Sequence, residues 1–163
     1  MALQSKMTVY LAIVGVFAMM GGIIYYASLD NSELEQAEIE LTNIEFMDEN
    51  TKDEPRFNVT FLINNPSDTT FTVSLIQYDL YADGILLGSG QYSTMDVSMP
   101  GRASFFPGTE IPLKNIFVLS KSEVEPEIFQ NVINNNVKKF TAEGIITTQN
   151  TWTTIEKEFK SEL

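Results

Sequence analysis

The most regular alternation of apolar and polar side chains in the chain is RFNVTFLINNP, at residues 56–66. Phe57, Val59, Phe61 and Ile63 share one parity, and mostly polar residues occupy the other. Because successive side chains point to opposite faces of a strand, this stretch predicts a β-strand with one strongly buried face. The asparagines and the proline that follow favour a turn, which ends the strand.

Similar alternation occurs on both sides of this stretch, with a change of parity inside two of the runs. The apolar residues concerned are Ile39, Leu41, Ile44 and Phe46 in the first run, and Phe71, Val73, Leu75, Ile76, Tyr78 and Leu80 in the second. A parity change within one strand requires a β-bulge or a strand that crosses between sheets. The dipeptide Asp83-Gly84 then predicts a two-residue type I′ hairpin.

The second half of the chain predicts further strands and one helix. Residues 103–118 read as one or two strands broken at Pro107-Gly108, residues 140–148 as a strand, and residues 151–159 as an edge strand. The helix is predicted after a capping box at residues 122–125, SEVE. Its apolar stripe is Ile128, Phe129, Val132 and Ile133, and asparagines at 134–136 end it.

Six or seven short strands with regularly spaced turn signals, together with one helix, predict a two-sheet antiparallel β-sandwich over residues 37–163. Before it, residues 7–29 form an uncharged apolar run. As a helix this run is about 34 Å long, and a membrane's hydrocarbon core is about 30 Å thick. We therefore expect a cytoplasmic stub and transmembrane anchor at residues 1–29 and an acidic stalk at residues 30–36.

The flanks of the apolar run indicate its orientation. Lys6 precedes it and acidic residues follow it, and the lysine favours a cytoplasmic N-terminus and an extracytoplasmic C-terminal domain, whereas acidic residues add little to this rule. The run is longer than the core of a signal peptide, and Tyr25-Tyr26-Ala27 is a poor cleavage site, so we expect an uncleaved, single-pass anchor in the cell membrane. The positions that characterise this helix are Met7, Tyr10, Gly15, Ala18, Gly22, Tyr25, Tyr26 and Leu29.

Composition excludes several classes of function. The 163 residues carry a net charge of −12 and include neither histidine nor cysteine. Disulfides, zinc fingers and Ser–His–Asp triads are therefore excluded, and the acidic balance disfavours nucleic acid as a partner. The acids at 48–54 lack EF-hand spacing and read as a solvated loop. Carboxylate pairs such as Asp79 with Asp83, or Glu123 with Glu127, have no convergent base or nucleophile. We expect no catalytic, cofactor or metal site.

Four segments of the outer domain together resemble a known family: VTFLINNP at 59–66, YDLYADG at 78–84, LGSG at 87–90 and MPGR at 99–102. They resemble the water-stress and hypersensitive-response (WHy) domain of the group 2 late-embryogenesis-abundant (LEA) proteins, over roughly residues 38–149. The resemblance rests on Asn65, Pro66, Tyr78, Leu80, Tyr81, Gly84, Gly88, Gly90, Pro100 and Gly101. Turn chemistry and close packing explain these residue types, so a structural role is expected for each.

The resemblance implies an immunoglobulin- or fibronectin-III-like sandwich with one helix, an association with desiccation and stress, and no established catalytic activity. Two functions therefore remain open. The first is a membrane-tethered, non-enzymatic domain that binds or stabilises envelope components. The alternative is an accessory or structural subunit of a membrane or surface-filament complex, whose helix packs against other subunits through Gly15, Ala18 and Gly22. The lipid bilayer is a partner in both, and no small-molecule ligand is indicated. Asn58, in Asn58-Val59-Thr60, is an N-glycosylation acceptor.

Residues 30–163 should fold without the anchor as a soluble, β-rich monomer, because this fragment carries its own strands, an amphipathic helix and most of the negative charge. Far-ultraviolet circular dichroism of the purified fragment should be dominated by strand. A spectrum dominated by helix or by disorder would contradict this expectation.

Overall fold

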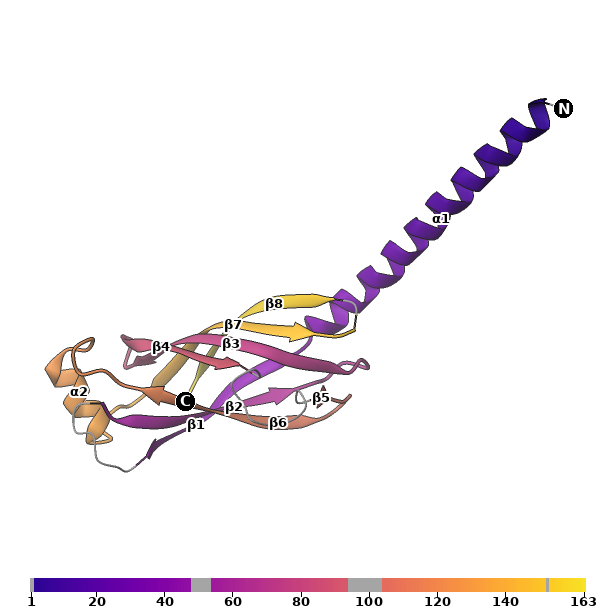
Figure 1. The fold of residues 1–163 in the computed structure, drawn as a ribbon. Coiled ribbons are helices and arrows are strands. Elements are labelled where there is room, and N and C mark those ends of the chain that lie inside the picture. The colour runs from indigo at the N-terminus through magenta and orange to yellow at the C-terminus, as the bar shows by residue number, and fades with distance from the viewer. Residues whose placement is uncertain (1, 48–53, 94–103, 152) are drawn as a thin grey trace.

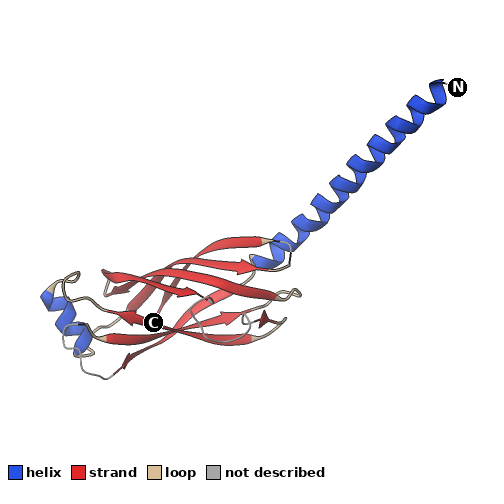
Figure 2. Ribbon diagram, in the orientation of Figure 1, coloured by secondary structure: helices blue, strands red, loops and turns tan. Residues whose placement is uncertain are grey.

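The computed structural model describes residues 2–47, 54–93, 104–151 and 153–163 (Figure 1). A long N-terminal helix is followed by a β domain with a second, short helix. The elements in chain order are α1 (Ala2–Leu34), β1 (Glu38–Met47), β2 (Arg56–Asn64), β3 (Phe71–Ala82), β4 (Ile85–Ser93), β5 (Ser104–Phe105), β6 (Glu110–Val118), α2 (Pro126–Ile133), β7 (Phe140–Gln149) and β8 (Thr154–Glu162). The two helices lie at opposite ends of the β domain (Figure 2).

The strands form two antiparallel sheets. One sheet has the order β1-β2-β6, and the five-stranded sheet has the order β4-β3-β7-β8, with β5 paired to β3. The prediction of a mainly β protein with two antiparallel sheets is therefore confirmed, with eight strands in the described part of the chain. The finer assignment to an immunoglobulin- or fibronectin-III-like type stays a prediction. The expected edge strand is β8, which lies at one edge of the larger sheet.

Alternation along β2 places its apolar side chains in the core, as the sequence predicts. Phe57, Val59, Phe61 and Ile63 are all buried, and β2 is the central strand of its sheet. Phe61 meets the opposite sheet, where its ring lies 4.9 Å from the ring of Tyr78, centroid to centroid, in a T-shaped arrangement. The core thus lies between the two sheets.

Both predicted parity changes are β-bulges. The register between β3 and β7 shifts between Val73 and Leu75, and the register between β1 and β2 shifts between Leu41 and Asn43. Since β3 remains in one sheet on both sides of the shift, the alternative of a strand crossing between sheets is excluded. The predicted hairpin is also confirmed, because Asp83 and Gly84 have φ angles of 49° and 86°.

The capping box predicted at residues 122–125 is wrong. Helix α2 begins at Pro126, and its N-cap is Glu125, which makes no side-chain capping hydrogen bond. A residue before proline is driven out of the helical region, and Glu125 accordingly has ψ of 138°. Ser122 instead forms a hydrogen bond of 2.9 Å between its Oγ and that of Ser120. The rest of the prediction is confirmed, with Phe129 and Val132 buried and Asn135 at φ 55° after the helix.

Helix α1 continues through residues 30–34 of the predicted acidic stalk, which contain neither glycine nor proline. Its segment Lys6–Tyr26 is long and apolar enough to cross a membrane, and none of that segment is buried in the protein. A signal sequence would have the same properties. The apolar segment of this N-terminal helix therefore lies outside the core of the β domain.

The C-terminal end of α1, by contrast, is part of the β domain's core. Leu34 and Ala37 are 0% exposed. The Lys157 ammonium, on β8, donates hydrogen bonds of 2.8 Å to the backbone carbonyls of Glu35 and Ala37. A helix ends with unpaired carbonyls and partial negative charge, so a lysine at this position stabilises the end of the helix. Beyond the helix, the Leu41 N–H donates to Ser161 Oγ at 2.8 Å and joins β1 to β8.

Leu34→Ala should destabilise the β domain although Leu34 belongs to the helix. Removing a fully buried leucine side chain costs about 2–5 kcal/mol, so the denaturation midpoint of the full chain in micelles should fall clearly. Leu11→Ala is the matched control, because Leu11 is 73% exposed on the same helix. Equal midpoints for the two variants would show that the helix end does not contribute to the core.

Candidate functional site

Asn65, one of the residues on which the family resemblance rests, is fully buried directly after β2. Its Nδ2 donates to the carbonyls of Thr69 and Phe105, at 2.9 and 2.8 Å. Its Oδ1 accepts hydrogen bonds from the Ser67 N–H, at 3.1 Å, and from Ser67 Oγ, at 2.7 Å. A primary amide has two donor hydrogens and two acceptor lone pairs, and all four are used here. The Asn65 side chain is therefore not available to a ligand.

The backbone of Asn65 extends this network to the turn before β6. Its N–H donates to the Thr109 carbonyl at 3.0 Å, and its carbonyl accepts from the Gly108 N–H at 2.8 Å. Pro66, which follows, is exposed and has no N–H that requires a partner. Together these contacts hold the β2–β3 loop, β5 and the β5–β6 turn to one another.

Tyr78 occupies the centre of the core. Its side chain is 2% exposed and faces inward with Leu80. Asn115 Nδ2, on β6, donates to the Tyr78 hydroxyl at 3.3 Å. Burial raises the pKa of the Tyr78 hydroxyl well above its usual value, with a smaller opposing effect of the Asn115 hydrogen bond. Tyr78 is therefore a neutral core residue that links the two sheets.

Glycines make room for this ring and its neighbours. A Cβ on Gly90, which pairs with Tyr78 across β3 and β4, would lie 2.3 Å from Cζ of the tyrosine ring. A Cβ on Gly88 would lie 3.3 Å from the ring of Phe117. On the other side of Tyr78, a Cβ on Gly144 would lie 2.0 Å from the Gln77 carbonyl oxygen. These glycines therefore allow close packing of rings and strands.

The other sequence-predicted positions lie at separate places. Pro100 and Gly101 fall outside the described residues. Asn58 is half-buried on the face of β2 opposite to Phe57 and Val59, and its glycosylation stays a prediction. The helix positions lie on α1, where those between Lys6 and Tyr26 are exposed: Met7, Tyr10, Gly15, Ala18, Gly22, Tyr25 and Tyr26. Leu29 lies in α1 as well.

Carboxylates that could have formed a catalytic pair have different partners. Asp83 accepts hydrogen bonds from the backbone N–H groups of Lys138 and Lys139, at 3.2 and 3.1 Å. Asp79 accepts instead from Ser89 Oγ at 2.6 Å. Glu123 precedes α2, Glu127 lies in its first turn, and both are exposed. Within the described ranges, no group of three or more His, Cys, Asp or Glu residues could hold a metal ion.

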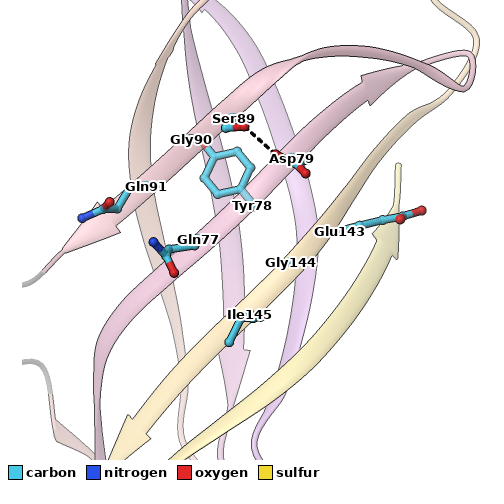
Figure 3. Close-up of a pocket in the computed structure, with 9 residues that line it drawn as sticks. All are labelled: Gln77, Tyr78, Asp79, Ser89, Gly90, Gln91, Glu143, Gly144 and Ile145. Atoms are coloured by element: carbon cyan, nitrogen blue, oxygen red, sulfur yellow. Dashed lines mark hydrogen bonds between the residues drawn. The ribbon is translucent and has the colours of Figure 1, made fainter.

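Sequence reasoning did not find a concave polar surface on the larger sheet, which we call the sheet groove. It is a shallow depression of about 470 Å³ on the five-stranded sheet (Figure 3). The residues that line it are Gln77, Tyr78, Asp79, Ser89, Gly90, Gln91, Glu143, Gly144 and Ile145. It adjoins a second depression of about 510 Å³, which shares Asp79, Glu143, Gly144 and Ile145 and adds Tyr81, Glu158, Phe159 and Lys160.

Charge in the sheet groove is concentrated on two facing carboxylates. Asp79 and Glu143 are directly opposite in the register of β3 and β7. Ser89 Oγ donates to Asp79, and Lys160 Nζ pairs with Glu143 Oε1 at 2.6 Å. The hydrogen bond and charge of Glu143 raise the pKa of Lys160. A ligand here would therefore meet hydrogen-bond acceptors and a predominantly negative surface.

The sequence carried one signal of this groove. Glycine inside a strand indicates a close approach of backbones, and Gly144 lies in the middle of β7. Which outward side chains it brings together depends on the pairing of β3 with β7, two strands far apart in the sequence. That pairing was not deducible from the alternation of either strand.

Comparison with known proteins identifies the fold and not a family. Models of protein families give no match, and no curated protein sequence is significantly similar. Membership of the LEA group therefore stays a prediction.

Solved structures with the same fold are distant in sequence. The X-ray structure of the structural-genomics target SoR45 is 11% identical, covers 80% of this chain and 87% of its own, and has a TM-score of 0.50. The solution structure of AT1g01470 from Arabidopsis thaliana is 16% identical, with coverages of 77% and 80% and a TM-score of 0.51. A candidate LEA protein, At2g46140.1, is 12% identical over 88% of both chains, at a TM-score of 0.39. For the first two structures, the likeness at these identities extends to the fold alone.

Asn65→Ala should lower the free energy of unfolding by about 2 kcal/mol, since the buried Phe105 carbonyl and the Ser67 N–H lose the Asn65 amide as a partner. Asn43→Ala is the control, because Asn43 is exposed and its amide bonds only to the exposed Glu45 carboxylate among the hydrogen bonds described. Urea denaturation of the two variants measures the difference. A cost below that of the control would contradict the structural role of Asn65.

Proposed function

We propose that the protein is a membrane-tethered, non-enzymatic protein whose β domain lies outside the cytoplasm and binds or stabilises envelope components. The observation that carries this proposal is the segment Lys6–Tyr26, whose apolar side chains are exposed and have no protein cover. At about 1.5 Å per residue it is roughly 31 Å long, which matches the hydrocarbon core of a bilayer. Exposed apolar surface of this extent is unfavourable in water, and lipid would cover it.

The junction of α1 with the β domain supports a permanent anchor. Residues 27–34 extend the helix by about 12 Å beyond the apolar segment, and a headgroup layer is about 5–7 Å thick. Because Leu34 is buried in the core, the β domain would then be held just beyond the headgroups. A signal peptide needs no such attachment to the mature domain.

Two features of the structure support the absence of catalysis, and the family resemblance supports a role in stress. The fully used amide of Asn65 and the core position of Tyr78 give the most specific residues of the family resemblance structural roles. The carboxylates of the sequence-derived pair, Asp79 and Asp83, bond to separate partners, Ser89 Oγ and the backbone N–H groups of Lys138 and Lys139. The stress and desiccation role rests on the resemblance of residues 59–66 and 78–90 to WHy domains.

The alternative is an accessory subunit whose helix packs against another membrane protein. It is favoured by the glycines of α1, since a Cβ on Gly15, Gly21 or Gly22 would meet nothing within 4 Å. With Ala18, these positions would allow a second helix to approach closely. In this version the β domain docks on the outer face of the same complex.

Protease added to intact cells or spheroplasts should remove the β domain and leave the N-terminus protected. The expectation follows from Lys6 at the N-terminal end of the apolar segment, because lysine and arginine favour the cytoplasmic side of a membrane helix. Immunodetection of tags at the two ends gives the readout. A mature N-terminus at Ser28 or later would show a cleaved signal peptide, and a protected β domain would show the opposite orientation.

Exchanging residues 7–29 for an unrelated single-pass helix distinguishes the two functions. A tether requires only an apolar helix of similar length, so survival under osmotic stress should be unchanged. The triple variant Gly15→Leu/Ala18→Leu/Gly22→Leu should likewise be neutral. Loss of a co-purifying membrane protein in both variants, with the β domain still displayed, would instead establish the accessory-subunit function.

A further inference from the structure

Side chains on the outward face of the five-stranded sheet form two rows across neighbouring strands. The register places Ser89, Asp79, Glu143 and Lys160 in one row. The adjacent row consists of Gln91, Gln77, Ile145 and Glu158. Tyr78, between Gln77 and Asp79, is buried on the inward face, so both rows face away from the core. Figure 3 shows the two glutamines and Asp79 around the sheet groove.

The stability of the sheet explains Ser89 and Lys160, which bond Asp79 and Glu143 in the first row, but it does not explain why the two carboxylates face one another. Like charges directly opposite on neighbouring strands are destabilising, and Asp79 and Glu143 have that relation. The exposed side chains of Gln77 and Gln91 make no hydrogen bond to any part of the chain that the structure describes. Hydroxyl groups of a ligand would supply donors to the remaining lone pairs of the carboxylates and partners to the exposed amides.

The polar groups of the sheet groove match hydroxyl groups. A carboxylate only accepts hydrogen bonds and an amide does both, whereas each hydroxyl is donor and acceptor at once. Ile145 and the ring of Tyr81, in the two adjoining depressions, add apolar surface of the kind that C–H faces of a sugar cover. Because the depressions are open and contiguous, an extended chain could lie across them.

Charge limits the ligand further. Asp79, Glu143 and Glu158 line the two depressions, and Lys160, the cation among their lining residues, is paired with Glu143. Phosphates, uronic acids and other anions would be repelled at this surface.

We propose that the sheet groove binds neutral oligosaccharide chains, with Gln77, Gln91, Asp79 and Glu143 as the groups that bond the sugar hydroxyls. This inference rests on the proposed function, because it names the class of envelope component that the tethered domain meets. The tethered domain would then attach the membrane surface to a neutral glycan.

The test uses the full chain in phosphatidylcholine nanodiscs, without sugar-headed detergents, and isothermal titration calorimetry. The probes are neutral hexasaccharides, namely cellohexaose, maltohexaose, chitohexaose and mannohexaose, and the acidic hexagalacturonate. At least one neutral probe should bind, and the acidic probe should bind about tenfold more weakly or not at all. The double variant Gln77→Ala/Gln91→Ala should weaken the neutral probe about tenfold. Asn43→Ala, which removes an exposed amide from the other sheet, is the matched control and should bind as the unmodified chain does.

Three results would overturn the proposal: no binding of any neutral probe, equal binding of hexagalacturonate, or equal affinity of the glutamine double variant. Co-elution with nanodiscs keeps the two proposals separate. A chain that co-elutes and binds no neutral probe contradicts the glycan proposal alone, whereas a chain that does not enter nanodiscs contradicts the tether itself.

Discussion

Burial of Leu34 and Ala37 in the core of the β domain is the contact on which the whole arrangement depends. It makes the last turn of a long apolar helix part of a folded β structure. Lys157 completes the contact by donating to the carbonyls of Glu35 and Ala37, which directly follow the helix. Because this lysine lies on an edge strand of the larger sheet, the helix is attached to that sheet directly. A bilayer around the helix would therefore fix the distance of the β domain from the membrane surface.

Inside the domain, one row of residues across the larger sheet packs against the other sheet and also determines how the strands pair. Gly90, Tyr78, Gly144 and Phe159 are neighbours across four strands, and Phe61 from the other sheet contacts both rings, at 4.9 and 5.8 Å between centroids. The absence of side chains on the two glycines lets the tyrosine ring and strand β7 come close. The same approach of β7 to β3 sets Asp79 against Glu143 on the outward face. The close approach of β7 to β3 therefore determines both the packing around Tyr78 in the core and the pairing of the two carboxylates on the outer face.

Local patterns predicted the parts of this structure that local forces determine. Alternation identified β2, parity changes identified two bulges, and Asp83-Gly84 identified the hairpin. The capping box at Ser122 failed because the proline at 126 overrides the serine. The partners of Asn65 and the sheet groove were beyond prediction, since Phe105, Thr109 and Glu143 reach them only through long-range strand pairing. A single sequence contains no direct record of that pairing.

The most direct test of the central claim, that α1 and the β domain form one unit, is a distance measurement by electron spin resonance. The chain has no cysteine, so Ile24→Cys and Glu158→Cys carry two spin labels without background. Pulsed dipolar spectra of the full chain in nanodiscs should give one narrow distance distribution, since the helix is continuous to Leu34 and that residue is buried. Leu34→Ala should broaden it. A broad distribution in the chain with native Leu34 would contradict the account, because it would mean that the helix end is not held by the core.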